Sequence, residues 1–273
     1  IDMNITHVIR GDDHVNNTPR QINIFRALAK EPPVYAHLPT VLNEQGEKMS
    51  KRHGAKPVTQ YRDDGFLPDA MVNYLARLGW SHGDDEIFSR EQFLEWFNLD
   101  HLGRSAAQFD EAKLRWVNAQ HMKAMPDEKL AQFVAGQLVK RGIDPVRPEL
   151  VEGHLARVCA LFKDRCDTTV ALADWAAKFY TPIQPNPEEV AKHVVEGVRP
   201  AVSMLAKMLE ICPWDKAAIG EAIKEVLRAT GMKMPQLAMP VRVLVMGTAQ
   251  TPSLDAVLEL CGRETVLERL KAA

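Results

Sequence analysis

Residues 48–52 read Lys48-Met49-Ser50-Lys51-Arg52, and they follow the turn-forming segment Asn43-Glu44-Gln45-Gly46-Glu47. Gly46 lets the backbone reverse direction at little steric cost. The cations repel one another, and Glu47 is the one acid next to them in the sequence, so the stretch favours an anion. A polyphosphate suits it because ammonium groups stabilise the charge that develops on leaving pyrophosphate. The alternative is an ordinary solvated basic loop.

Four further segments restrict the interpretation of this basic stretch. They are His7-Val8-Ile9-Arg10-Gly11-Asp12-Asp13-His14, Asn17-Thr18-Pro19-Arg20-Gln21, Tyr61-Arg62-Asp63-Asp64-Gly65-Phe66-Leu67-Pro68 and Leu78-Gly79-Trp80-Ser81-His82-Gly83-Asp84. In this order and spacing, the segments resemble the class I aminoacyl-tRNA synthetases, and specifically the bacterial glutamyl-tRNA synthetases. The resemblance is strongest over residues 5–120 and continues more weakly to the C-terminus.

The resemblance implies roles for particular residues. Lys48 and Lys51 are the expected catalytic lysines, and Ser50, Lys51 and Arg52 are expected to bind ATP, which would act with Mg²⁺ in the complete enzyme. The arginine that matches Arg10 faces the glutamate substrate, and guanidinium geometry suits a carboxylate. From the residues alone, a surface ion pair of Arg10 with Asp12 or Asp13 is equally open.

One part of the family pattern is absent from this sequence. The nine histidines include no His-x-Gly-His, the family's other ATP signature, and the chain begins with Ile1-Asp2. We therefore expect a C-terminal portion that lacks the N-terminal Rossmann-like catalytic fold and is inactive alone. Two alternatives are a non-catalytic helical RNA-binding or interaction module and a different nucleotidyl transferase that shares the lysine loop.

Composition sets broader limits on the class of protein. The chain has 273 residues, 46% of them hydrophobic, and a net charge of −2, so RNA binding would need local basic patches. No apolar run approaches the length of a membrane span. The cysteines, which form no CxxC pair, are Cys159, Cys166, Cys212 and Cys261. Reduced thiols in a cytoplasmic protein, with no zinc or other metal site, are the expectation. Cys159 and Cys166 share a face if one helix carries both.

The hydrophobic pattern predicts a mainly α fold with short strands and the lysine loop near the N-terminus. We expect strands at 5–10 and 35–42 and a helix that Thr18 and Gln21 begin as a capping box. A second capping box is expected at Ser89–Gln92. The helix from Pro68 is expected to turn Met71, Tyr74, Leu75 and Leu78 inward.

Proline and glycine positions predict three domains, at 1–125, 126–184 and 185–273. The first would hold the lysine loop and the tRNA stem-contact helices, where Lys113 and Arg115 are candidates for the tRNA backbone. The other two would be helical anticodon-binding subdomains, ending in a short apolar run at 240–247 and two helices. Basic candidates in this tail are Lys140, Arg141, Arg157, Lys163 and Arg165. The resemblance implies a monomer that binds the tRNA for glutamate, and leaves open whether glutamine tRNA is also accepted.

Overall fold

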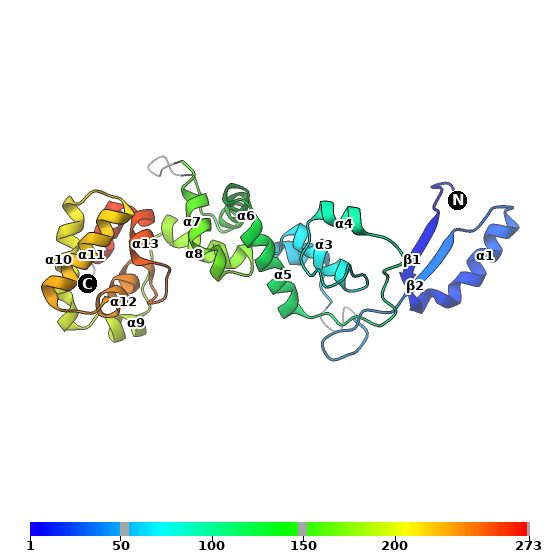
Figure 1. The fold of residues 1–273 in the computed structure, drawn as a ribbon, viewed down its shortest axis with the longest axis horizontal. Coiled ribbons are helices and arrows are strands. Elements are labelled where there is room, and N and C mark those ends of the chain that lie inside the picture. Colours follow the sequence, from blue (N-terminus) through cyan, green and yellow to red (C-terminus); the bar gives the residue numbers. More distant parts are fainter. Residues whose placement is uncertain (50–54, 147–151, 272–273) are drawn as a thin grey trace. The chain divides into compact units, whose positions relative to one another are not determined.

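The computed structural model describes residues 1–49, 55–146 and 152–271. The chain forms two compact units, Ile1–Ala124 and Met125–Ala273. Helices predominate in both units, and the described residues contain one sheet, of two strands, so the predicted mainly α fold is confirmed (Figure 1). None of the described helices is both long and apolar enough to cross a membrane.

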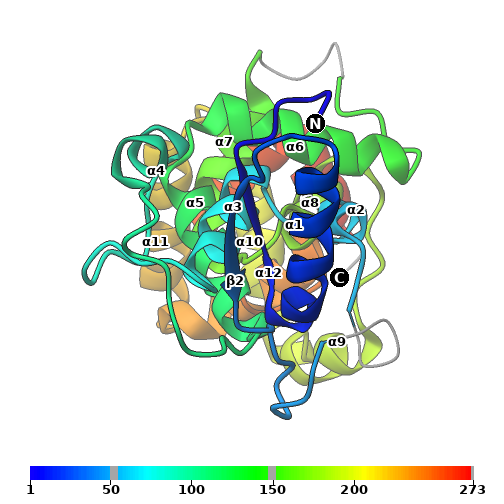
Figure 2. The same ribbon diagram turned by 90° about the vertical axis from the view of Figure 1, so that its right-hand side faces the viewer.

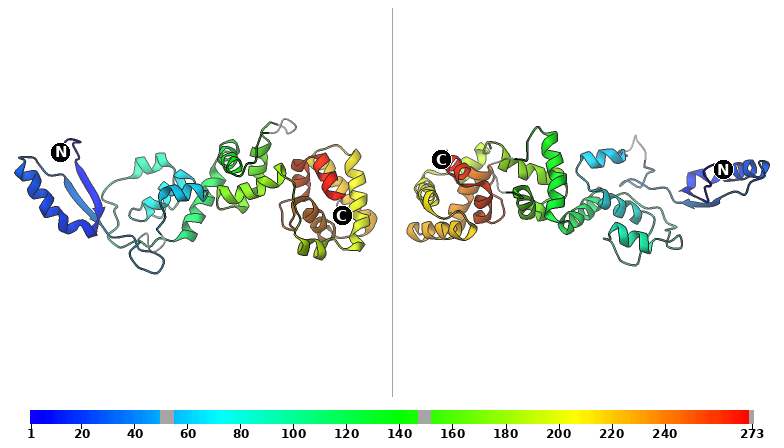
Figure 3. Two further views of the ribbon diagram at one scale, coloured as in Figure 1. Left: turned by 180° about the vertical axis from the view of Figure 1, so that it is seen from behind. Right: turned by 90° about the horizontal axis from the view of Figure 1, so that it is seen from above.

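The first unit opens with a small layer of two parallel strands and one helix. Strand β1 (His7–Gly11) pairs with β2 (Val34–Leu38), so that His7 lies opposite Val34 and Gly11 opposite Leu38. The chain passes between them through the 3-10 helix η1 (Asp12–Asn17) and helix α1 (Thr18–Ala27), as a parallel pair requires. Figures 2 and 3 show α1 running alongside the two strands. None of residues 1–42 is buried.

The predicted capping box at the start of α1 is wrong. Asn17 is the N-cap residue, and no side chain caps this helix end. The Thr18 hydroxyl and the Gln21 side-chain carbonyl instead accept hydrogen bonds from Arg10, both at 2.9 Å. The charged guanidinium therefore takes the two side chains that would otherwise have bound backbone amides.

The rest of the first unit packs four helices around an aromatic core. They are α2 (Val58–Asp63), α3 (Pro68–Arg77), α4 (Arg90–Trp96) and α5 (Glu111–Ala124). The capping box that begins α4 is confirmed, because Ser89 and Gln92 exchange both bonds. In α3, Met71 and Tyr74 are buried as expected, but Leu75 is 45% exposed. Asn73 is buried instead, where its amide carbonyl accepts from the Phe88 amide and its amino group donates to the Glu86 carbonyl.

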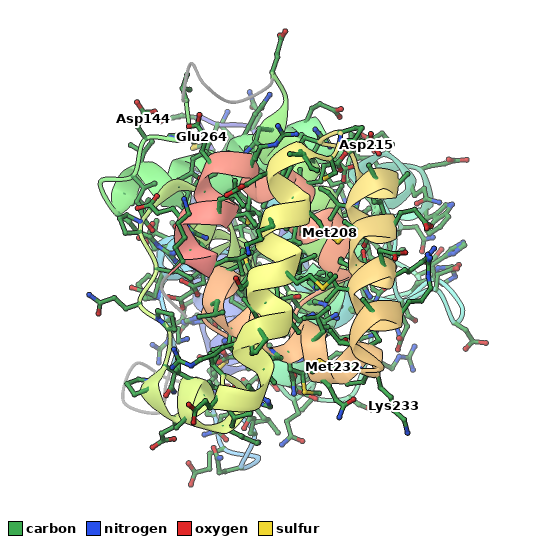
Figure 4. All side chains as sticks on the ribbon, turned by 90° about the vertical axis from the view of Figure 1, so that its left-hand side faces the viewer. Asp144, Met208, Asp215, Met232, Lys233 and Glu264 are labelled. Atoms are coloured by element: carbon green, nitrogen blue, oxygen red, sulfur yellow. The ribbon has the colours of Figure 1, made fainter. Side chains whose placement is uncertain are left out.

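The second unit is all helical over its described residues. Its elements are α6 (Asp127–Lys140), α7 (His154–Phe162), η3 (Lys163–Arg165), α8 (Thr169–Tyr180), α9 (Pro187–His193), η4 (Glu196–Val198), α10 (Arg199–Ile211), α11 (Lys216–Thr230), α12 (Met234–Met246), α13 (Leu254–Cys261) and α14 (Arg263–Leu270). Helices α10 and α11 lie side by side in Figure 4, where Asp215 marks the start of α11 and Met232 and Lys233 follow its end. Fully buried leucines such as Leu130, Leu205 and Leu237 form its core.

One expectation for the second unit is wrong, and the condition set for two of its cysteines is not met. The apolar run at 240–247 is not a separate segment, because it completes α12, which contains Pro240. A proline inside a helix removes one backbone hydrogen bond, and here the extensive burial of the residues from Leu237 to Met246 offsets that loss. Cys159 and Cys166 do not share one helix either, since α7 ends at Phe162. Both thiols are buried, and burial raises the pKa of each to about 12.

Candidate functional site

Arg10 stands at the end of β1, where the sequence places a candidate substrate-binding arginine. Its guanidinium donates to the Gln21 and Thr18 side chains, to the His14 carbonyl at 3.3 Å and to Nε2 of His37 at 3.3 Å. The Tyr35 ring lies beneath it, with 5.2 Å from Cζ to the ring centroid. Together Arg10, Thr18, Gln21, Tyr35 and His37 form the Arg10 cluster, which joins β1, α1 and β2.

The acceptors in the Arg10 cluster are uncharged, and this contradicts the ion-pair alternative. Within the described residues, Arg10 has no carboxylate partner: the Asp12 carboxylate accepts from the Thr40 hydroxyl, and Asp13 pairs with Lys48. Nε2 of His37 acts as an acceptor toward Arg10. The arrangement orients the guanidinium and leaves its positive charge uncompensated, which suits an anionic ligand.

Lys48 is the cation of residues 48–52 that the structure describes. Its ammonium lies 2.8 Å from an Asp13 carboxylate oxygen, and this bond holds the pKa of Asp13 below its usual range. Ser50, Lys51 and Arg52 lie outside the described residues. The expected roles of those three residues stay predictions.

The turn before Lys48 is built around one buried side chain. Asn43 is 8% exposed, and its side-chain carbonyl accepts from the amides of Gln45 and Glu47. Gly46 has φ +79°, a conformation that glycine adopts without strain. Lys48 then bridges back to Leu42 in antiparallel fashion. These contacts place the Lys48 backbone at the end of a short hairpin.

Lys113 and Arg115, the predicted contacts to the tRNA stem, lie on α5 and already have acidic partners. Lys113 pairs with Glu86, and its ammonium lies 4.0 Å from the centroid of the Trp116 ring. Arg115 pairs with Glu111, one turn earlier, at 3.1 Å. Both side chains remain partly exposed, so a phosphate would have to compete with a carboxylate for them.

In the second unit, the basic candidates of the tail differ in whether they form ion pairs. Arg141 pairs with Asp174, Arg157 with Glu259 and Lys163 with Asp127. Arg165 differs, because it donates to a backbone carbonyl, that of Thr251.

Arg242 joins Arg165 at the segment around Thr251, and sequence reasoning did not single it out. It donates to the Pro252 carbonyl at 3.3 Å, and burial with the nearby charge of Arg165 lowers its pKa. Its Nε is buried without a partner. Within the described residues, neither arginine faces a carboxylate. The signal that could have identified Arg242 is its position as the one cation in the apolar run from Val241 to Met246.

The described residues contain no group of three or more histidine, cysteine, aspartate or glutamate side chains arranged to hold a metal ion. Two places where described arginines have no carboxylate partner are the Arg10 cluster and the pair Arg165 and Arg242. Arg263 and Arg269 also donate to backbone carbonyls.

Comparisons with known proteins match both parts of the chain. A family profile described as the catalytic domain of class I tRNA synthetases (E and Q) matches residues 1–116, and one described as an anticodon binding domain matches 128–273. Glutamate–tRNA ligases from Paracidovorax citrulli and Albidiferax ferrireducens are 76% and 74% identical over 273 and 272 residues. These alignments cover 100% of this chain but 57% and 58% of those proteins.

Solved structures show the same fold. A glutamate tRNA ligase from Elizabethkingia meningosepticum, crystallised with its amino acid, superimposes with a TM-score of 0.84 and 24% sequence identity. The match covers 99% of this chain and 57% of that one. The glutamate-tRNA synthetase of Elizabethkingia anophelis gives a TM-score of 0.81 over the same shares.

Proposed function

The chain belongs to the class I tRNA synthetases of the glutamate and glutamine group, and we propose that it is the part of a glutamate–tRNA ligase that contacts glutamate, ATP and tRNA. In the complete enzyme, glutamate attacks the α-phosphate of ATP and pyrophosphate leaves. The glutamyl group then passes to the terminal ribose of its tRNA. Because the chain spans 57% of the length of its curated relatives, this activity is that of the longer protein.

Positioning and electrostatics dominate such a displacement, so cations matter more than an acid or a base. We assign Lys48 and Lys51 to the phosphates, with Ser50 and Arg52 beside them in ATP binding. ATP would enter as its Mg²⁺ complex. We also propose a cytoplasmic monomer with domains at 1–125, 126–184 and 185–273.

The observation that carries this proposal is the uncompensated charge of Arg10. Four hydrogen bonds and the Tyr35 ring fix the guanidinium, and every acceptor is neutral. A carboxylate of the substrate glutamate would supply the missing negative charge. Hydrogen bonds to a charged group contribute about 1.5–3 kcal/mol.

The test compares Arg10→Gln and Arg10→Lys in the full-length ligase by pyrophosphate exchange, with tRNA present. We expect Arg10→Gln to raise the KM for glutamate about 10- to 100-fold, since each 1.4 kcal/mol is tenfold. Arg10→Lys should recover part of the loss, because it keeps the charge without the planar fork. Arg62→Gln removes an exposed arginine elsewhere in the first unit and should change nothing. An unchanged KM for glutamate in Arg10→Gln would remove Arg10 from the site.

For the tRNA, we propose that Arg165 and Arg242 provide the main cationic contact of the second unit. Proteins bind RNA through phosphate contacts and by stacking or hydrogen bonding to unpaired bases. Arginines without acidic partners meet those groups at a lower cost than the paired Arg141, Arg157 and Lys163. Lys113 and Arg115 remain proposed contacts to the tRNA stem, where each would exchange a carboxylate for a phosphate.

A further inference from the structure

We infer that Asp13 is a positioning residue that holds Lys48 until the phosphates of ATP displace it. The inference rests on the proposed function, because it requires Lys48 to meet those phosphates. In this arrangement, Asp13 and the polyphosphate are alternative partners of one ammonium group. Asp13 itself does not touch the substrate.

The pair joins two segments of the first unit that lie 35 residues apart in the sequence. Asp13 belongs to η1, which directly follows β1, the strand that carries Arg10. Lys48 belongs to the hairpin that Asn43 organises. The 2.8 Å bond therefore places the Lys48 ammonium next to the strand end that carries Arg10.

The backbone around Asp13 is shaped to admit its carboxylate. A Cβ on Gly11 would lie 2.6 Å from an Asp13 carboxylate oxygen, which is too close for any real contact. Gly11 has φ −62° and ψ 148°, a conformation that every residue adopts readily. The room for the carboxylate, rather than backbone freedom, is thus what glycine provides at this position. On the neighbouring residue, the Asp12 carboxylate accepts from the Thr40 hydroxyl at 2.8 Å.

The pair is exposed, and this makes it exchangeable. The side chains of Lys48 and Asp13 are 59% and 43% exposed. Water and salt weaken such ion pairs, so each contributes little to stability. A polyphosphate brings several anionic oxygens to the same ammonium and competes well against one carboxylate. The pKa of Asp13 is lowered chiefly by its bond to Lys48, so the carboxylate is charged at neutral pH and remains a competitor there.

If Asp13 and ATP compete for Lys48, loss of the Asp13 charge should improve ATP binding, whereas damage to the fold would weaken it. Removing the charge of Asp13 frees Lys48, so ATP should bind more tightly. In the full-length ligase, with glutamate and tRNA present, we expect Asp13→Asn to lower the KM for ATP about three- to fivefold and to leave kcat unchanged. The kcat stays because ATP displaces Asp13 before the chemical step.

Three further variants make the test specific. Asp13→Glu keeps the charge and should restore most of the wild-type KM. Gly11→Ala pushes the carboxylate aside without removing it and should lower the KM in the same direction. Glu221→Gln breaks a similar exposed pair in α11, where Glu221 lies 2.7 Å from Lys224, and should have no effect.

A double-mutant cycle with Lys48→Met decides whether Asp13 acts through Lys48. In that background, Asp13→Asn should lose at least half of its effect on log KM. The inference is overturned if Asp13→Asn leaves the KM for ATP unchanged or raises it, or if its effect is equal with and without Lys48. Pyrophosphate exchange by the wild type would still support the proposed function in that case. An absence of pyrophosphate exchange in the wild type would overturn the proposed function and this inference with it.

Discussion

Different interactions stabilise the strand layer at residues 1–42 and the helical second unit. The layer contains no buried residue, and Ile24 on α1 is 59% exposed. The second unit has fully buried leucines in α6, α10 and α12. Polar contacts to Arg10 order the layer, whereas apolar burial orders the second unit. The comparison shows that the residues proposed for chemistry lie where packing is weakest.

This difference has a simple physical basis. A two-stranded sheet with one helix buries too little apolar surface to be stable independently. Directional hydrogen bonds can still fix one guanidinium in such a layer. A packed helical core excludes water and tolerates little change in volume.

The largest expected effect comes from truncating the core of the second unit. Leu205 on α10 is fully buried, so Leu205→Ala should lower the free energy of unfolding of this unit by about 2.7–5 kcal/mol. Ile24→Ala on α1 should cost less than about 0.5 kcal/mol, because its side chain is already exposed. Denaturant unfolding followed by circular dichroism measures both. Equal losses in the two variants would contradict the comparison.

A smaller effect is expected from pH, through a buried histidine of the second unit. His154 on α7 donates from Nε2 to the Leu260 carbonyl at 2.8 Å, and its Nδ1 accepts from the Tyr180 hydroxyl at 2.9 Å. Burial lowers the pKa of His154, and Arg157 adds to this. The folded state therefore keeps His154 neutral at pH values where the unfolded chain binds a proton.

Stability of the second unit should thus fall as the pH drops below about 6.5, the ordinary pKa of histidine. The decline should reach at most about 1.4 kcal/mol per pH unit and end below the folded-state pKa. Unfolding curves between pH 7 and pH 5 provide the measurement. His154→Gln should flatten this dependence, and an unchanged slope in that variant would show that another group is responsible.

The smallest effect concerns the capping box of α4 in the first unit. Ser89→Ala leaves the Gln92 amide without its side-chain acceptor. We expect a loss of about 1 kcal/mol in the free energy of unfolding of the first unit. Ser89→Asp supplies another good cap and should lose much less. Thr18→Ala should not behave as the loss of a cap, because Thr18 contacts Arg10 rather than a backbone amide.

Local sequence signals predicted the elements well where no distant side chain interfered. Ser89 and Gln92 form the expected capping box at the start of α4. Thr18 and Gln21 carry the same signal, but Arg10 claims both side chains. Pro240 was a reasonable helix boundary, yet tertiary packing keeps it inside α12.

The candidate site was predictable only in part, since its geometry depends on residues far apart in the sequence. The position of Arg10 at a strand end was visible, and its role was suggested by resemblance. The Asp13 partner of Lys48 was not, because turn chemistry does not reveal which distant acid meets a lysine. For the same reason, Arg165 appeared as one basic residue among several, and its convergence with Arg242 on the segment around Thr251 required the fold.

The proposal that Arg165 and Arg242 bind tRNA is tested most directly by a titration. This chain is titrated with glutamate tRNA and with an unrelated tRNA at two salt concentrations. The titration compares the double variant R165Q/R242Q with R141Q/R157Q, which removes the same charge from arginines that have acidic partners. We expect wild-type binding to be selective and weakened by salt, with R165Q/R242Q at least tenfold weaker and less dependent on salt. R141Q/R157Q should stay within about threefold of wild type. Equal effects of the two double variants, or binding independent of salt, would contradict the account.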